Sequence, residues 1–134
     1  LTLAQQVDLT GAIVVTTPQD ISLIDTRRAL DLFDRLEVPV LGVVENMAGL
    51  AQPDGSVVDL FGSGGGEDAA ARLAVPLLGS VPLSLALRVG GDSGEPVVLG
   101  HPDDPAAAAI AGIAAQLATR ARGLSGRKLG LSVT

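Results

Sequence analysis

The sequence has no cysteine and only two aromatic residues, and both features limit what the protein can be. Without cysteine, the chain itself supplies no disulfide framework, no thiolate zinc site and no thiolate iron–sulfur site. The aromatic residues are Phe33 and Phe61, so the core must be built from Val, Leu, Ile and Ala. An aliphatic core of this kind favours a sheet that is covered by helices.

Positive charge and long hydrophobic runs are also scarce. Nine Lys and Arg residues stand against fifteen Asp and Glu residues, and the resulting net charge of −6 argues against a surface that binds nucleic acid. No apolar run reaches the roughly 18 residues of a membrane span, and the N-terminus lacks the pattern of a signal peptide. We therefore expect a cytoplasmic protein that binds neither nucleic acid nor membrane.

The length of 134 residues suits one ordinary domain with its own core. The first residue is Leu1 rather than Met, inside a segment, LTLAQQV, with the character of a helix. We therefore expect a fragment or a processed chain. We assign residues 1–122 to the domain and residues 123–134 to a C-terminal tail that is loose or docked elsewhere.

The first part of the chain predicts a βαβ unit. Residues 11–17, GAIVVTT, form a continuous apolar run, as in a strand that is covered on both faces of a parallel sheet. Residues 20–36 have the periodicity of an amphipathic helix, and the apolar run VPVLGVVEN follows at residues 38–46. Strand, crossover helix and strand predict a parallel pair with a right-handed connection.

The middle of the chain predicts further elements of the same kind. A short strand is possible at residues 57–60, and the glycine cluster FGSGGGE at residues 61–67 precedes a short helix over residues 68–74. The run VPLLGSVPL at residues 75–83 predicts a third strand. The predicted fold class is α/β, with a doubly wound, mostly parallel sheet that carries helices on both faces.

After the third strand, residues 84–88 lead into GGDSGEP at residues 90–96, which predicts a glycine-rich turn. We expect PVVL at residues 96–99 to be a short edge strand or an extended segment. The last helix is clearer, because Asp104 is a suitable N-cap and Pro105 suits the first turn.

Asn46 ends the second strand, and open parallel sheets bind ligands at the carboxyl ends of their strands. Its amide offers an acceptor and two donors, which is the pattern that pairs with the N6 amino group and a ring nitrogen of adenine. A simpler interpretation is that Asn46 turns the chain by bonding to its own backbone. Residue type alone favours the turn and leaves the base contact open.

Other catalytic and ligand-binding motifs fail on their spacing. The glycine cluster lacks the Walker lysine, since the only lysine is Lys128, and Glu67 replaces the third glycine of G-x-G-x-x-G. We therefore predict a flexible turn and a helix start there. His101 is the only histidine, and the scattered acids are a weak metal signal. Since no G-x-S-x-G motif is present either, we predict no catalytic residue and no metal ligand in this chain.

Four segments in a fixed order carry a family resemblance: TTPQD, VENM, FG-x-GG and RVGGDSGEPVV. Together they resemble the C-terminal portion of the Mrp/ApbC family, a group of P-loop ATPases related to MinD and ParA and implicated as iron–sulfur cluster carriers. The resemblance extends from residue 1 to about residue 118. It implies the second part of a P-loop NTPase-like domain that lacks its N-terminal part here.

The resemblance also implies a role for the strand ends. It implies that Asn46 contacts adenine, and that the segment from Val81 to Ser84 forms the other wall of the base pocket. Ser84 stands where the family often carries Asp. The residues expected to bind ATP in the longer protein are Asn46, Met47, Pro82, Leu83 and Ser84.

Two departures from the family limit what the resemblance implies. The Walker loop and the switch motif D-x-P-P-G-T-G-D lie upstream of Leu1 in the family, so this chain alone should not hydrolyse ATP. Many members also carry C-P-x-C after the Asn-Met pair, where two subunits supply four thiolates to a bridging cluster. This chain reads Ala51-Gln52-Pro53-Asp54, so the resemblance does not carry an iron–sulfur cluster over to it.

The resemblance implies the C-terminal part of an Mrp-type ATP-binding or ATPase protein that serves iron–sulfur cluster carriage or assembly. Its partners would be a second copy, in a homodimer, and iron–sulfur acceptor proteins. An alternative is a nucleotide-gated interaction module resembling MinD or ParA, although the acidic charge and the lack of an amphipathic membrane tail disfavour DNA and membrane roles. A third interpretation is an incomplete chain that folds poorly, because a cut sheet exposes an edge.

Overall fold

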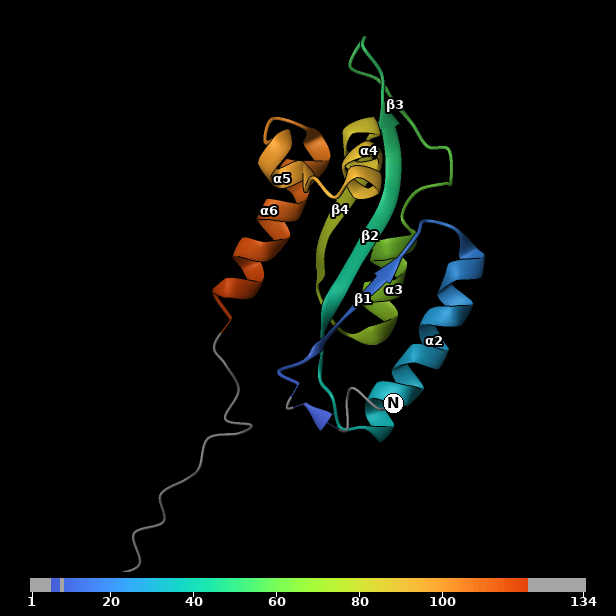
Figure 1. Cartoon of the computed structure of the whole chain (residues 1–134). Helices are drawn as coiled ribbons and strands as arrows, with labels where there is room; N and C mark the ends of the chain where they lie inside the picture. Colours follow the sequence, from blue (N-terminus) through green and yellow to red (C-terminus); the bar gives the residue numbers. More distant parts are fainter. Residues whose placement is uncertain (1–5, 8, 121–134) are drawn as a thin grey trace, which may run out of the picture.

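The computed structural model describes residues 6–7 and 9–120, and Figure 1 shows their arrangement. Most of LTLAQQV and the predicted tail at residues 123–134 lie outside the described residues. The elements, in chain order, are β1 (Ala12–Thr16), α2 (Asp20–Arg35), β2 (Val40–Ala51), β3 (Val57–Val58), α3 (Gly65–Leu73), β4 (Leu77–Leu83), α4 (Leu85–Ser93), α5 (Val97–Gly100) and α6 (Pro105–Ala118).

The sheet has β2 at its centre, and both β1 and β4 pair with it in parallel (Figure 1). The short β3 pairs antiparallel with the end of β2 and forms a projecting hairpin. The β1–α2–β2 unit is therefore the parallel pair that the apolar runs predict. The β2 strand is longer than expected, because it continues past Asn46 into the hairpin.

Helices cover both faces of this sheet, which confirms the predicted α/β class. Neighbouring residues of a strand point to opposite faces, so Val43 and Val44 enter different cores. The core under α2 and α3 contains Val14, Val43, Ala69 and Ala70, with Phe33 of α2 packed against it. The core under α6 contains Val44, Leu78, Val81, Ala106 and Ile113. Both clusters of buried residues are aliphatic, as the shortage of aromatic residues requires.

Two predictions for the segment after β4 are wrong. The predicted glycine-rich turn is largely helical, because α4 includes Gly90 and Gly91 and ends only at Gly94, whose φ is 76°. Gly90 is closely packed, since a Cβ there would overlap the carbonyl oxygen of Glu95. The expected strand PVVL is the short helix α5, with Pro96 as its N-cap. Caps and tertiary packing override the low helix propensity of this segment.

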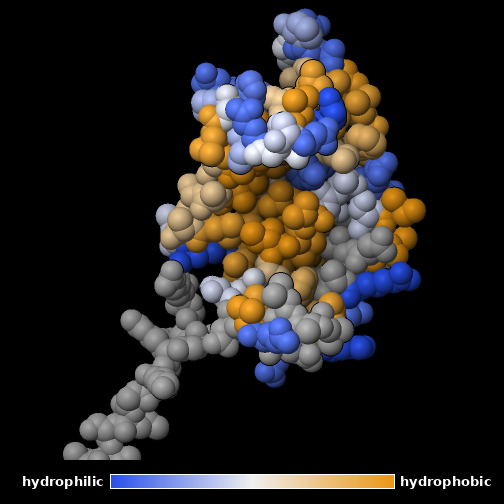
Figure 2. Space-filling view, in the orientation of Figure 1, coloured by the Kyte–Doolittle hydropathy of each residue, from blue (hydrophilic) through white to orange (hydrophobic). Residues whose placement is uncertain are grey.

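One face of β1 is open within the part of the chain that the structure describes. Val15 pairs with Val44 in register, so both side chains point to the same face of the sheet. Helix α6 covers this face where β4 lies. Over β1, however, Ile13 is 37% exposed and Val15 is 62% exposed. Figure 2 shows a hydrophobic area in the middle of the corresponding side of the molecule. No helix among the described residues is long and apolar enough to span a bilayer.

Candidate nucleotide-binding site

The carboxyl ends of the three parallel strands lie at one edge of the sheet. Asn46 on β2 pairs in register with Val81 on β4, so the end of β4 lies beside the stretch of β2 that contains Met47. The structure thus brings together the two segments that contain the predicted pocket residues Asn46, Met47, Pro82, Leu83 and Ser84. Asn46, Pro82, Leu83 and Ser84 are partly buried, and Met47 is exposed.

The side chain of Asn46 makes a local hydrogen bond. Its Oδ1 atom accepts from the backbone N–H of Met47 at 2.9 Å, which is the turn-forming bond of the simpler interpretation. The N–H group of Met47 also decides the orientation of the Asn46 amide, because Oδ1 can accept from an N–H group and Nδ2 cannot. Oδ1 keeps its second lone pair, and the described residues place no partner on Nδ2. The amide is therefore held in one orientation with a donor and an acceptor still free.

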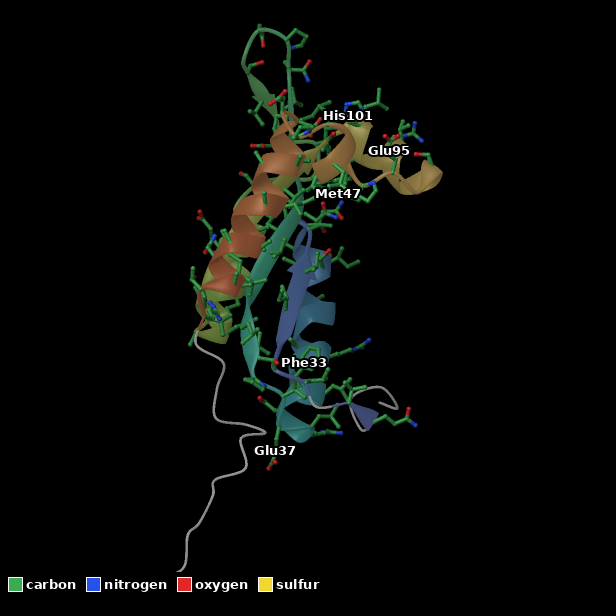
Figure 3. All side chains as sticks on the ribbon, turned by 60° about the vertical axis from the view of Figure 1, so that its left-hand side comes forward. Phe33, Glu37, Met47, Glu95 and His101 are labelled. Atoms are coloured by element: carbon green, nitrogen blue, oxygen red, sulfur yellow. The ribbon has the colours of Figure 1, made fainter. Side chains whose placement is uncertain are left out.

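Met47 marks an irregular point in β2. Its φ is 59°, in the left-handed region that a non-glycine residue rarely adopts, and the register between β2 and β4 shifts between Asn46 and Leu50. Such backbone strain persists only where the surrounding structure enforces it, and it is common at binding sites. Figure 3 shows Met47 at the same end of the molecule as Glu95 and His101, while Phe33 lies towards the opposite end.

Ser84 joins two helix N-termini. Its hydroxyl accepts from the N–H of Leu87 at 3.1 Å, which caps α4, and donates to Oδ2 of Asp104 at 2.8 Å. The other carboxylate oxygen of Asp104 accepts from the N–H of Ala106 at 2.8 Å, which confirms the predicted cap of α6. The Ser84 hydroxyl is therefore committed to linking the two helix N-termini.

Ser84→Ala is expected to destabilise the chain by about 1–2 kcal/mol, because it removes the α4 cap and one partner of a capping carboxylate. Urea unfolding of the 134-residue chain measures the change. The matched control is Ser63→Ala, since Ser63 is exposed and has no hydrogen bond to its side chain within the described part of the chain. Equal losses in the two variants would contradict the linking role of Ser84.

Glu45 is a buried carboxylate that sequence reasoning did not single out. Its side chain accepts from the N–H of Gly66 at 2.8 Å through Oε1 and from the hydroxyl of Ser80 at 3.1 Å through Oε2. An acidic residue directly after a run of apolar residues was the available signal, but the glycine that it meets lies 21 residues further along the chain. Such a pairing becomes visible only when the fold is known.

The glycine cluster is a closely packed helix start. A Cβ on Gly65 would overlap the carbonyl oxygen of Pro18, and a Cβ on Gly66 would lie 2.6 Å from Cβ of Glu45. These glycines are therefore needed because Pro18, just after β1, and Glu45 of β2 occupy the space where side chains would lie. The predicted helix start is confirmed.

The hairpin between β2 and β3 contains the residues at which the resemblance to the Mrp/ApbC family predicts C-P-x-C. When the proline of this motif is aligned with Pro53, the two cysteine positions fall at Gln52 and Gly55. The four matching residues are therefore Gln52 to Gly55 rather than Ala51 to Asp54. A tight turn joins these positions, with the N–H of Gly55 donating to the carbonyl of Gln52 at 3.0 Å. Gly55 has φ 86°, which favours glycine. Since no thiolate is available, the residues present do not fit a cluster site.

Asp54 stabilises the same turn. One of its carboxylate oxygens accepts from the hydroxyl of Ser56 at 2.6 Å and from the N–H of Ser56 at 2.9 Å. The side-chain hydrogen bond, followed by the backbone one, lowers the pKa of Asp54 below its ordinary value of 3.8. The carboxylate is therefore ionised near neutral pH, and its bonds to Ser56 are lost only when the pH falls through the lowered pKa.

Parallel strands with helices on both faces and candidate ligand residues at their carboxyl edge define a doubly wound α/β fold of the nucleotide-binding type. The septum site-determining protein MinD of Pyrococcus horikoshii, complexed with Mg-ADP, has a TM-score of 0.66 at 25% identity, over 82% of this chain and 42% of that one. A nucleotide-binding protein of Archaeoglobus fulgidus in complex with ADP has a TM-score of 0.62 at 29% identity, over 70% and 39%.

The model of the family described as ParA: NUBPL iron-transfer P-loop NTPase matches residues 1–118, and the chain belongs to this family. The iron-sulfur cluster carrier protein of Synechocystis sp. is 52% identical over 120 residues, which cover 88% of this chain and 34% of that protein. The resemblance seen in the sequence motifs is therefore confirmed. The chain spans about a third of the length of such curated relatives.

Proposed function

We propose that this chain is the adenine-binding part of a longer ATP-binding protein of the iron–sulfur carrier type. The observation that carries the proposal is the amide of Asn46, which lies on the central strand one residue past its last pair with β1 and is oriented by the N–H of Met47. Membership of a P-loop NTPase family and the ADP complexes of two structural neighbours support a nucleotide as the ligand.

The free groups of Asn46 suit adenine. Nδ2–H donates to a ring nitrogen, and the remaining lone pair of Oδ1 accepts from the N6 amino group. Guanine carries a carbonyl oxygen where adenine carries N6, so it would place an acceptor against Oδ1. By strand alternation, Leu83 lies on the same face as Val81, the partner of Asn46, and offers apolar surface to the ring. Ser84 holds that wall through its bonds to α4 and α6. The site therefore favours ATP over GTP.

The phosphates of ATP must be bound by other residues. The described residues contain no lysine, and phosphoryl transfer requires positive charge and N–H donors at the phosphates. The exposed face of β1, at Ile13 and Val15, is an apolar surface of the kind that a further part of the same domain would cover. This chain therefore binds and orients the base, and hydrolysis belongs to the longer protein.

We also propose that the longer protein is a cytoplasmic homodimer that serves iron–sulfur acceptor proteins. The name of the Synechocystis relative, an iron-sulfur cluster carrier protein, supports the last part of this proposal. Because this chain has no cysteine, any thiolate ligands of a cluster must come from elsewhere. The same lack of thiolates keeps a second function open, that of a nucleotide-gated interaction module like MinD. Iron and sulfide retained by the longer protein after reconstitution would favour the carrier.

The experiment compares this chain with a hybrid protein, in which the chain replaces the matching 120 residues of the Synechocystis relative. Calorimetry is expected to show ATP binding by the hybrid, with a preference over GTP, and none by the chain alone. A folded hybrid that does not bind ATP would contradict the proposal, as would ATP hydrolysis by the chain alone. A hybrid that does not fold would contradict the match between this chain and the rest of the domain.

A further inference from the structure

We propose that Glu45 is a positioning residue of the nucleotide site: it clamps the middle of β2 to α3 and β4 and thereby holds Asn46 in place. This inference rests on the proposed function, because it assigns the clamp to the same base pocket. Glu45 does not reach the base itself, since neighbouring residues of a strand point to opposite faces of the sheet.

The contacts of Glu45 show a fully engaged side chain. The residue is only 6% exposed, and burial of a carboxylate is costly unless hydrogen bonds replace its water. Its two oxygens bind different elements, because Oε1 accepts from Gly66 at the start of α3 and Oε2 accepts from Ser80 on β4. A side chain held at both oxygens leaves its own backbone little freedom, and the next residue in the chain is Asn46.

The strand register places this clamp at the edge where the ligand is proposed to bind. Thr16 of β1 pairs with Glu45, and Glu45 pairs with Ser80, so the three residues form a row across the parallel strands. Asn46 begins the next row and points to the other face, where Val44 packs under α6. The bonds of Glu45 thus fix β2 on the face that α3 covers, and the amide of Asn46 lies on the opposite face, where we propose the pocket.

The start of α3 is shaped for this contact. Gly66 allows the helix to approach because a Cβ would lie 2.6 Å from Cβ of Glu45, and Gly65 packs in the same way on the backbone of Pro18. The N–H group of Gly66 is one of those that a helix leaves unpaired in its first turn, where a carboxylate is also favoured by the helix dipole. The helix start therefore packs against both the end of β1 and the middle of β2.

The test measures base selectivity, which a merely structural role would leave unchanged. Calorimetry gives the ratio of ATP to GTP affinity for the hybrid protein and for its Glu45→Ala, Glu45→Gln and Asn46→Ala variants. We expect Glu45→Ala and Asn46→Ala each to lower the ratio by about ten-fold. Glu45→Gln is expected to keep the ratio, because an amide accepts from Gly66 and donates to Ser80 in the same positions.

Each outcome has a distinct meaning. If Glu45→Ala weakens ATP and GTP equally while Asn46→Ala lowers the ratio, the base pocket stands and the positioning role is overturned. If Asn46→Ala leaves the ratio unchanged, the base contact fails, and the inference about Glu45 fails with it. The control is Glu67→Ala, an exposed acid in the first turn of α3, which is expected to leave the ratio unchanged.

A second variant covers the case in which Glu45→Ala does not fold. Ser80→Ala removes one of the two bonds of the clamp and leaves Glu45 bound to Gly66. We expect a smaller loss of the ATP to GTP ratio than in Asn46→Ala, together with a shift of the Gly66 amide resonance in NMR spectra. An unchanged ratio in Ser80→Ala with a shifted Gly66 resonance would overturn the positioning role.

Discussion

Asn46→Ala is expected to weaken ATP binding to the hybrid protein by about 1–3 kcal/mol, which is the value of a bidentate contact between an amide and adenine. The substitution removes both groups that we assign to the base, the Nδ2 donor and the free lone pair of Oδ1. Calorimetric titration with ATP measures the loss. Titration with GTP is expected to change much less, because the amide makes no matching pair with guanine.

Asn46→Asp separates the base contact from the turn. A carboxylate still accepts from the N–H of Met47, so the local hydrogen bond and the stability of the strand end are kept. It has no N–H group at neutral pH, so it cannot donate to the ring nitrogen. We expect Asn46→Asp to lose ATP binding as Asn46→Ala does. Full ATP affinity in Asn46→Asp would show that Asn46 only turns the chain.

Gly65→Ala is expected to destabilise the 134-residue chain by about 1–3 kcal/mol, the usual cost of forcing an extra carbon into packed structure. The added Cβ would overlap the carbonyl oxygen of Pro18, which is a backbone atom and cannot rotate away as a flexible side chain can. Helix α3 would have to move away from the end of β1. Urea unfolding measures the loss of stability.

Gly112→Ala is the matched control for this prediction. Gly112 lies on an exposed position of α6, and a Cβ there meets nothing within 4 Å. Because alanine favours the helix over glycine, we expect a gain in stability of about 0.5–1 kcal/mol. If Gly65→Ala behaved in the same way, the start of α3 would be a loosely packed loop, and the close approach of helix and strand ends would be wrong.

The parallel sheet could be predicted from the sequence because its signals are local. The apolar runs at β1, β2 and β4 are continuous, as buried parallel strands require, and the helix between the first two is amphipathic. The N-cap of α6 was equally readable, since Asp104 and Pro105 are adjacent. In these elements, residues close in the chain determine the structure.

The α4–α5 segment could not be predicted in the same way. Its glycines and Pro96 resemble a turn, and they form helices because the structure supplies contacts from elsewhere in the chain. The Ser84 cap is bonded to Asp104, which lies 20 residues further along. Local propensity is a weak guide where such long-range bonds act.

The candidate site divides in a similar way. The sequence predicts a strand end at Asn46, because the apolar run stops there, but β2 continues to Ala51. The orientation of its amide, the commitment of Ser84 to helix caps and the burial of Glu45 depend on three-dimensional neighbours. The family resemblance predicts the ligand at this edge of the sheet, and the structure adds how each of these side chains is held.

The most direct test of the account uses the side-chain amide of Asn46, which is the only asparagine in this chain. Its two N–H resonances can be assigned in NMR spectra of the asparagine-labelled hybrid protein by comparison with Asn46→Asp. We predict that ATP shifts these resonances strongly and GTP does not. Saturating ATP that leaves them unchanged would contradict the claim that this chain binds adenine through Asn46.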